Sequence, residues 1–340
     1  MATDLVSLVE AAYLRDESLE SWLGNLVRVA DATLSGGRGV FGIVVQSESG
    51  SSGDSDDSKT LFSNRTNVLA TSFSGMSDRI LEAAAPLLEF SPNEKLMERY
   101  RSAGPVGTLS GVFAKRGGEF DKRLMATGFA DALYLRASDT KGVELVLSIP
   151  GDRPIRLPAA RRLLLSYVAS HIKTAYRLRG KRADMSEEGD VEAILSPQGK
   201  IEHASGRAAS RDSRVVLRAA ALACVKAKAR ARGVDELSAL GEWKALFSGR
   251  WSVVDHFDTD GKMFIVACRN EPKTPQAKGL SARESLVAAL AAQGYSNKEI
   301  HYELGWPLST IASSLSSAIL KLGVSSRTAL IRVLSSGRRA

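Results

Sequence analysis

Residues 280–304 read LSARESLVAALAAQGYSNKEIHYEL, and this stretch decides the fold of the C-terminal part of the chain. Two segments in it begin with Ser-x-x-Glu, the first at Ser281 and Glu284 and the second at Ser296 and Glu299. In such a capping box the serine hydroxyl accepts a hydrogen bond from the third residue's backbone N–H, and the glutamate accepts one from the serine N–H. The pattern therefore predicts two consecutive helices, each beginning at its serine.

A third amphipathic helix is predicted after this pair. Its apolar residues recur at spacings of four, three and four, which places them on one face of a helix; they are Ile311, Leu315, Ala318 and Leu322. The opposite face is predicted to carry Thr310, Ser313, Ser314 and Ser317. Gly294 is expected to turn the chain between the first two helices, and Gly323 to end the third in the left-handed conformation. A fourth helix is predicted over 327–334, opened by Ser325 or Ser326.

The stretch from Leu280 to Leu330 resembles the LuxR/GerE-type helix-turn-helix over its whole length. The likeness is carried by three segments: Leu280–Glu284, Tyr295–Ile300 and Lys321–Val324. It implies a domain that binds double-stranded DNA with its third helix in the major groove. The DNA-contacting residues that it implies are Asn297, Lys298, Ser309, Thr310, Ser313, Ser314, Ser317 and Lys321.

The resemblance also implies a role for most of these residues. Ser309 and Thr310, at the start of the third helix, are expected to touch phosphates, and so are the two lysines. The other three serines are expected to face base edges.

Three positions depart from the family pattern. Ala312 stands where a basic residue is usual, Ser314 where histidine is frequent, and Pro307 where a capping serine is usual. Proline is tolerated in the first turn of a helix, so the fold is expected to survive it. Without a basic side chain at 312 and an imidazole ring at 314, only hydroxyl groups are left to read the bases. This predicts weaker direct readout and more dependence on DNA shape.

The bulk composition fits a soluble DNA-binding protein of several domains. The 340 residues are enough for two or three domains. The formal charge of +8 suits a polyanionic partner, and the segment from Lys278 to Ala340 alone holds eight Lys/Arg against three Glu. No apolar run is long enough to cross a bilayer, and no secretion signal opens the chain, so we expect a cytoplasmic protein with no membrane partner.

Upstream, residues 1–180 are predicted to form an α+β domain that loosely resembles a GAF-type sensor by element order alone. Two helices are expected between Leu5 and Leu34, and a helix at the end, over 158–178. Further helices are expected over 77–88 and 93–101. The expected strands are 40–45, 106–113, 130–136 and 143–150.

Residues 190–271 are predicted to form a second α+β domain, PAS-like by element order. A hairpin is expected over 191–202, with helices over 213–232 and 236–247 after it. A second hairpin is expected over 251–269, turning at Asp258–Gly261. A linker at Pro272–Gln276 then leads to the helix-turn-helix domain, 278–338. The predicted fold class is therefore mixed α/β in several domains, with a C-terminal all-α domain of four helices.

No enzyme motif, metal site or cofactor site is predicted. Gly37–Gly42 matches G-x-G-x-x-G, but a dinucleotide site needs a strand before it and a helix after it, and here the expected order is reversed. Asp255, His256, Asp258 and Asp260 lie close in sequence without the ligand spacing of a calcium loop, so a hairpin turn is the expected reading. The four histidines show no metal-binding spacing, and no nucleophile elbow or phosphate loop occurs.

The sequence thus predicts a sequence-specific transcription regulator that acts as a homodimer, with N-terminal regions that sense a signal or set the oligomeric state. RNA polymerase and an unidentified small-molecule ligand are further candidate partners. Two alternatives stay open. One is a signalling protein that works through protein contacts and has a DNA-incompetent tail, and the other is an enzyme in residues 1–270 anchored to DNA.

Overall fold

The computed structural model describes residues 5–14, 18–47, 66–88, 96, 99–100, 102–113, 118–138, 143–183, 191–230, 247–248, 251–257, 263–269 and 279–336. The chain divides into two compact units. The first comprises Met1–Lys173, Thr274–Ser296 and Ser314–Ala340, and the second comprises Thr174–Lys273 and Asn297–Ser313.

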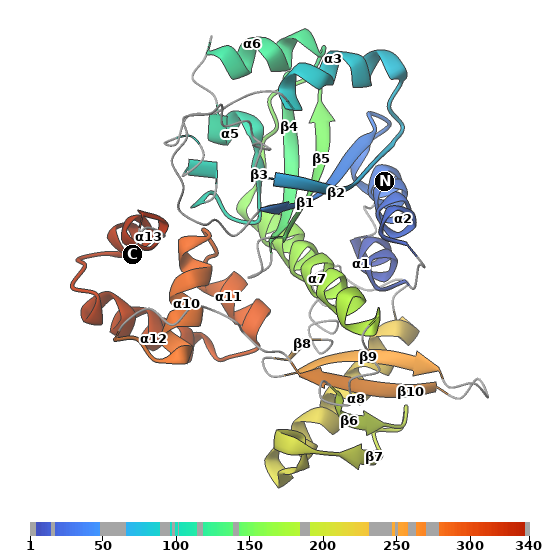
Figure 1. The fold of residues 1–340 in the computed structure, drawn as a ribbon, viewed down its shortest axis with the longest axis vertical. Helices are drawn as coiled ribbons and strands as arrows, with labels where there is room; N and C mark the ends of the chain where they lie inside the picture. Colours follow the sequence, from blue (N-terminus) through green and yellow to red (C-terminus); the bar gives the residue numbers. More distant parts are fainter. Residues whose placement is uncertain are drawn as a thin grey trace. The chain divides into compact units, whose positions relative to one another are not determined.

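The N-terminal part of the first unit is a five-stranded antiparallel sheet with helices (Figure 1). The sheet has the order β2-β1-β5-β4-β3. Its strands are β1 (Val40–Ser47), β2 (Thr66–Ser74), β3 (Val106–Thr108), β4 (Asp131–Ser138) and β5 (Val143–Gly151). The helices are α1 (Leu5–Tyr13), α2 (Leu19–Ala30), the π-helical turn Asp31–Ser35, α3 (Asp78–Leu88), α5 (Leu109–Phe113), α6 (Glu119–Ala126) and α7 (Ala159–Ala183).

The two faces of this sheet bury different sets of side chains, because successive residues of a strand point to opposite faces. On one face Ile43, Val45, Tyr134 and Val146 form a core with Phe113 of α5 and with residues of α6. On the other face lie Val44, Leu145 and Leu147, all fully or almost fully buried. The predicted mixed α/β N-terminal region is confirmed.

Helix α2 packs against β1 at a glycine. A Cβ atom added to Gly42 would lie 2.4 Å from Val27 Cγ2 and 3.2 Å from Leu23 Cδ1, both on α2. The strand therefore lets the helix approach more closely than any side chain would allow. The last glycine of the G-x-G-x-x-G pattern thus serves helix packing, and the pattern follows a helical segment and enters a strand, as expected.

Side-chain hydrogen bonds connect helix α1 to α2 and to α7. Trp22 Nε1 of α2 donates to the carbonyl of Ala12 in α1 at 2.9 Å. His171 of α7 lies with its Nδ1 3.2 Å from the hydroxyl of Tyr13 in α1. Burial lowers the pKa of His171 to about 3, so the ring is neutral in the folded chain.

Replacement of Gly42 by alanine is expected to lower the free energy of unfolding by about 1–3 kcal/mol, because the new methyl group overlaps Val27. The matched control is Gly24→Ala within α2, where the added Cβ would meet only Ser72 Oγ at 3.7 Å. Alanine there should be neutral or stabilising by up to about 1 kcal/mol, since it favours helix. Urea unfolding of both variants, followed by circular dichroism, measures the difference. Equal midpoints for the two variants would contradict the close approach.

The prediction of a strand over 106–113 is wrong in its second half. Only Val106–Thr108 is extended, and α5 follows it at once. The buried carboxylate of Asp131 accepts hydrogen bonds from Ser110 N at 3.0 Å and Ser110 Oγ at 2.7 Å, and Thr108 Oγ1 accepts from Gly111 N at 3.1 Å. These acceptors satisfy the first N–H groups of a helix, as capping side chains do.

The sequence analysis did not identify β2 or α6. Strand β2 lies at the edge of the sheet, and Val68 and Phe73 on it are exposed while Ala70 is buried. Its apolar residues therefore do not mark a buried face, so the alternation that reveals most strands gave no signal.

The second unit contains another five-stranded antiparallel sheet, of order β7-β6-β10-β9-β8. Its strands are β6 (Val191–Leu195), β7 (Ile201–Ala204), β8 (Phe247–Ser248), β9 (Trp251–Phe257) and β10 (Met263–Arg269), with a 3-10 turn at Gly206–Ala209 and helix α8 (Arg211–Arg230). Leu217 and Ala221 of α8 pack with Trp251 and Ile265 in its core. The buried Glu192 accepts a hydrogen bond from Trp251 Nε1 at 2.8 Å. Both predicted hairpins have the expected strands.

Several predictions fall outside the described residues. They are most of the helix expected over 93–101, nearly all of the helix over 236–247, the turn Asp258–Gly261 and the linker Pro272–Gln276. Among the helices that are described, none is long and apolar enough to span a membrane.

Candidate nucleic-acid interface

Between residues 280 and 336, where the structure describes the chain, there are four helices, as the sequence predicts. They are α10 (Ala282–Ala292), α11 (Asn297–Leu304), α12 (Leu308–Lys321) and α13 (Arg327–Ser336). Gly294 and Gly323 have φ values of +86° and +64°, the left-handed region expected for the turn and for the helix end. Ser326 caps α13, because its Oγ accepts from Ala329 N at 3.1 Å.

The capping box predicted at the start of α10 is present. Glu284 N donates to Ser281 Oγ at 3.3 Å, and Ser281 N donates to Glu284 Oε2 at 2.8 Å. Two N–H groups that the helix itself leaves unpaired are satisfied in this way. Helix α11 likewise begins immediately after the second predicted capping serine, Ser296.

The same carboxylate also joins α10 to the C-terminal half of α12. Glu284 Oε1 accepts a hydrogen bond from Ser317 Oγ at 2.5 Å, and Oε2 forms an ion pair with Lys321 Nζ at 2.8 Å. The hydrogen bonds from Lys321, from Ser317 and from the Ser281 backbone hold the pKa of Glu284 at about 2. An ionised Glu284 therefore contacts donors from two helices at once.

Neutralising Glu284 is expected to destabilise the folded chain in a pH-dependent way. Because its folded pKa of about 2 lies below the ordinary 4.5, the stabilisation is full above pH 4.5 and is lost as the pH falls through 2. The difference in unfolding free energy between wild type and Glu284→Gln should thus be largest near neutral pH and shrink towards pH 2. Urea titrations of both proteins at several pH values measure it. A pH-independent difference would show that charge plays no part.

Two local interactions define the short turn between α11 and α12. His301 Nδ1 lies 2.5 Å from the carbonyl oxygen of Trp306. Helix α12 begins directly after Pro307, whose carbonyl accepts from Ile311 N at 3.0 Å. The proline thus occupies the capping position, where an N–H has no partner inside the helix, so its lack of one costs nothing there.

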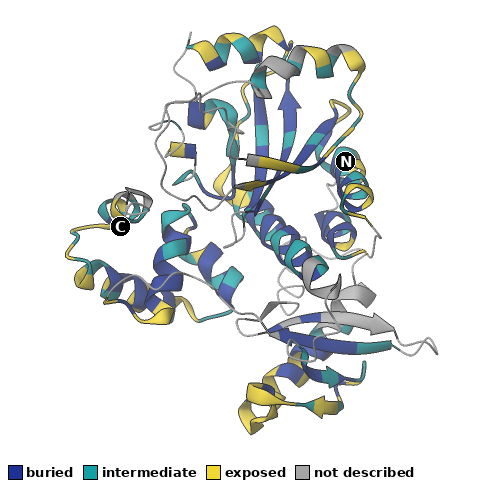
Figure 2. Ribbon diagram, in the orientation of Figure 1, coloured by how far each residue is buried: buried dark blue, intermediate teal, exposed yellow. Residues whose placement is uncertain are grey.

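Helix α12 has one buried and one exposed face, visible as blue and yellow in Figure 2. Ile311, Leu315 and Ala318 are buried, as predicted, whereas Leu322, the last residue of the predicted apolar face, follows the helix and is only half-buried. The exposed residues in the helix are Leu308, Ser309, Ala312, Ser313, Ser316, Leu320 and Lys321. All but Lys321 recur every three or four positions, so they form one surface, which we call the exposed face of α12.

The structure places the eight implied DNA-contacting residues in different environments. Ser309 and Ser313 lie on the exposed face, and Lys298 of α11 and Lys321 are exposed; Asn297 and Thr310 are half-buried. Ser314 is only 7% exposed, and Ser317 is half-buried and donates to Glu284. Exposure does not show whether a residue contacts DNA, so the DNA contacts of all eight residues stay predictions.

Ser316 was not among the candidates, although it lies near the centre of the exposed face. The sequence analysis placed the polar face directly opposite the four apolar residues. Ser314, however, lies three positions after Ile311 and four before Ala318, so it belongs to the buried side. The exposed face runs through Ser309, Ala312 and Ser316. Helical spacing from Ser309 would have found Ser316.

Helix α13 packs against α10. Arg327 Nη2 donates to the carbonyl of Tyr295, a residue that is itself buried. The ammonium group of Lys173, in α7, lies 5.4 Å from the centre of the Tyr295 ring. This geometry is typical of a cation–π contact.

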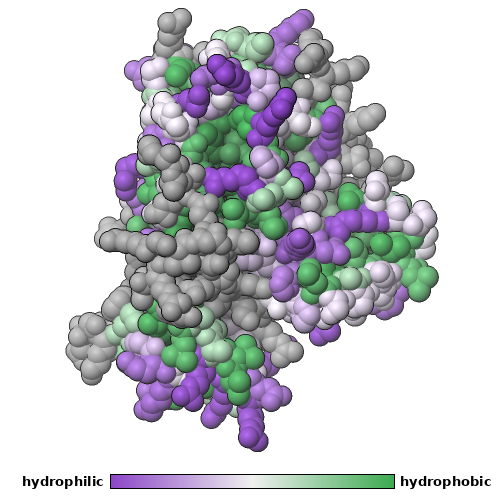
Figure 3. All heavy atoms as spheres, turned by 180° about the vertical axis from the view of Figure 1, so that it is seen from behind, coloured by the Kyte–Doolittle hydropathy of each residue, from purple (hydrophilic) through white to green (hydrophobic). Residues whose placement is uncertain are grey.

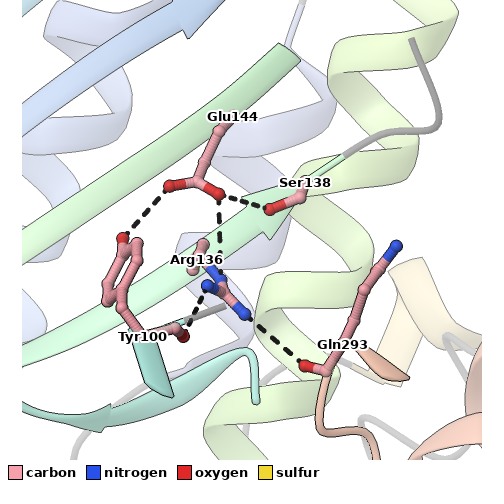
Figure 4. A network of polar contacts seen from close by, with 5 residues as sticks. All are labelled: Tyr100, Arg136, Ser138, Glu144 and Gln293. Carbon is pink, nitrogen blue, oxygen red and sulfur yellow. Dashed lines mark hydrogen bonds and ion pairs between the residues drawn. The ribbon is translucent and has the colours of Figure 1, made fainter. Parts of the chain in front are cut away.

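A buried polar cluster lies on the same face of the N-terminal sheet as the aromatic core (Figure 4). Arg136 is almost completely buried. Its Nη1 donates to the carbonyl of Tyr100 at 2.8 Å, its guanidinium carbon is 4.8 Å from the centre of the Tyr100 ring, and its Nε lies 3.9 Å from Glu144 Oε2. Glu144 accepts from Tyr100 Oη at 3.1 Å and from Ser138 Oγ at 2.9 Å. Burial, and then Glu144, raise the pKa of the Tyr100 hydroxyl.

This cluster extends to the turn that follows α10. Arg136 Nη2 lies 3.5 Å from the carbonyl oxygen of Gln293 (Figure 4). Beside it, a Cβ atom added to Gly294 would lie 2.2 Å from the carbonyl oxygen of Ser102 and 2.4 Å from Gly104 N. The backbone at Gly294 therefore lies against the backbone at 102–104, at a distance that only glycine permits.

Comparison with known proteins identifies the C-terminal helices. The model of the GerE family, described as "Bacterial regulatory proteins, luxR family", matches residues 278–334. None of the curated proteins matches the chain. Among solved structures, the bacteriophytochrome RpBphP3 from the photosynthetic bacterium R. palustris is similar, with 12% identity and a TM-score of 0.33 over 89% of this chain and 75% of that chain. A likeness this low does not establish a shared fold.

The family's description is of regulatory proteins and not of enzymes. The matched residues, 278–334, cover α10, α11, α12 and all of α13 but its last two residues. The resemblance inferred from Leu280–Glu284, Tyr295–Ile300 and Lys321–Val324 is confirmed. Residues 278–334 are a helix-turn-helix domain of the bacterial luxR regulatory family, which supports a DNA-binding transcription regulator in general.

Proposed function

We propose that the chain is a sequence-specific transcription regulator that binds double-stranded DNA through α11 and α12. The observation that carries the proposal is the exposed face of α12, which lies in the region that matches the luxR family. The helix contains no acidic residue, and Glu284, the acid next to it, is neutralised by Lys321. A helix with such a surface can enter the major groove without repelling phosphates.

The proposal assigns a phosphate contact to Lys298, which is exposed at the start of α11. Its positive charge there adds to the N-terminal end of the helix dipole, and both attract a phosphate group. Ser309, at the start of α12, is exposed in the corresponding position of the next helix. Such contacts fix the orientation of the domain on the duplex but do not select a sequence.

Full-length protein is expected to bind DNA from its own promoter more tightly than scrambled DNA, with affinity that falls steeply as salt rises. Lys298→Gln should weaken binding to both duplexes alike and reduce the slope of log K against log salt by about 0.9, because one phosphate contact is lost. Lys122→Gln, at an exposed lysine of α6, is the matched control and should leave the slope unchanged. Fluorescence anisotropy over a salt series provides the measurement.

The same titration decides between this function and its alternative. A protein that acts through protein contacts, with a tail that does not bind DNA, predicts weak binding without sequence preference at every salt concentration. Selective binding that disappears at high salt is incompatible with that alternative.

We further propose that the protein works as a homodimer on two half-sites and that the N-terminal region, which we interpret as GAF-like and PAS-like, controls the helix-turn-helix. Two half-sites bound by a dimer lie about 34 Å apart, or a multiple of that distance. The support for control is the buried Arg136, whose partners include both the N-terminal Tyr100 and Gln293 at the end of α10. A change of packing around Tyr100 would therefore reach the helix-turn-helix through one side chain.

Arg136→Lys is expected to change the DNA affinity by several-fold, because lysine lacks the planar fork that serves Tyr100 and Gln293 together. It should also speed amide hydrogen exchange over 290–296. Ser138→Ala is the matched control, since it removes one hydrogen bond to Glu144 but none to Gln293. If Arg136→Lys matches wild type in both measurements, the proposed control through this side chain is refuted.

A further inference from the structure

The exposed face of α12 has an unusual chemistry for a surface that reads DNA. Its members are three aliphatic residues, Leu308, Ala312 and Leu320, and three serines. Among the described residues Leu320 is 81% exposed and Leu308 is 44% exposed, so both present hydrocarbon to the surroundings. Figure 3 shows apolar side chains among polar ones on the surface of the C-terminal helices, at the right of that view.

The side chains that usually distinguish bases are almost absent from this helix. Guanine is read by Arg or Lys, adenine by Asn or Gln, and cytosine by Asp or Glu. The sequence of α12, LSTIASSLSSAILK, contains only one of these residue types, at Lys321. Lys321 lies at the C-terminal end of the helix, and its ammonium group is 2.8 Å from Glu284 Oε2. It is therefore held by an acid of α10 and not available as a free reader of guanine.

The groups that remain have a clear preference. A serine hydroxyl both donates and accepts, so it fits every base edge and discriminates little. A methyl or isobutyl group is matched by one feature of the major groove, the C5-methyl group of thymine. Aliphatic contact with it removes apolar surface from water on both sides.

Building on the proposed function, we infer that α12 reads A·T base pairs through thymine methyl groups, with Leu308 and Ala312 as the specificity-determining residues. Both lie in the first turns of the helix, the part of a recognition helix that contacts base edges. They are four residues apart, so they lie side by side on one face. Leu320 continues the apolar surface towards the other end of the helix.

Short side chains next to them favour this readout. Ser309, Ser313 and Ser316 all lie on the exposed face, and none extends more than two atoms from the backbone. They allow the backbone of α12 to approach the floor of the groove, where the methyl groups are. Their hydroxyls satisfy the polar atoms that the approach removes from water, so these atoms are not left unpaired.

The inference is tested with the full-length chain and a duplex chosen by it from a random-sequence library. Each thymine of the selected duplex is replaced in turn by deoxyuridine, which keeps every pairing and hydrogen-bonding group and lacks only the methyl. At each contacted thymine, the Kd measured by anisotropy should rise roughly four-fold, the equivalent of one buried methylene-sized group. At thymines outside the contact the Kd should not change.

Leu308→Ala tests the partner on the protein. At one thymine the penalty for deoxyuridine should shrink in this variant, because the contact is already lost. Leu222→Ala is the matched control, since Leu222 of α8 is the same residue type at the same 44% exposure. It should keep the full penalty.

The outcomes separate this inference from the proposed function. Selective, salt-dependent binding in which every deoxyuridine duplex binds as tightly as the parent refutes methyl readout and leaves DNA binding intact. Selection of sites without thymine refutes it as well. Absence of any selective, salt-dependent binding overturns both.

Discussion

The helix-turn-helix domain depends on one carboxylate. Glu284 closes the capping box of α10 and also receives Ser317 and Lys321 from α12. A single ionised group thus contacts both the first residue of the α10 cap and the C-terminal half of α12. Charge-assisted hydrogen bonds are stronger and shorter than neutral ones, and they require a defined geometry. The direction in which α12 presents its exposed face follows from this geometry.

The contacts of Glu284 also determine which groups remain on the surface of α12. Two polar residues of α12, Ser317 and Lys321, are engaged by Glu284, and Ser314 is buried. The groups that remain on the surface are serines and aliphatic side chains. If the domain binds DNA as proposed, charge for holding the phosphates comes from elsewhere in the domain, as at Lys298, and base selection falls to hydrocarbon and hydroxyl groups. In the proposed mode of binding, the stability of the domain and its choice of sequence are therefore connected through Glu284.

In the N-terminal sheet, too, single residues determine how neighbouring elements pack. Gly42 lets α2 lie close to β1, and the buried Asp131 accepts hydrogen bonds from the N–H and hydroxyl of Ser110 at the start of α5. On one face of the sheet Arg136 brings together Tyr100, Glu144 and Gln293. A buried guanidinium is stable only when its donors and its charge are matched, so a change at any of these partners is felt by the others.

The sequence by itself determined the elements whose signals are local. The capping serines, the glycines at 294 and 323 and the apolar spacing of 311–322 predicted the four C-terminal helices. Their family was indicated by the resemblance of Leu280–Glu284, Tyr295–Ile300 and Lys321–Val324 to the LuxR/GerE type. Periodicity predicted most strands of both sheets. These signals work because caps, turns and amphipathic faces depend on residues a few positions apart.

Only the tertiary structure decided the rest, because those features depend on residues distant in sequence. Residues 109–113 form a helix whose cap includes the distant Asp131, and β2 is an edge strand on which Val68 and Phe73 are exposed. No local pattern shows that Glu284, thirty-seven positions before Lys321, holds its ammonium group. Such contacts are set by packing, which brings together what the chain separates.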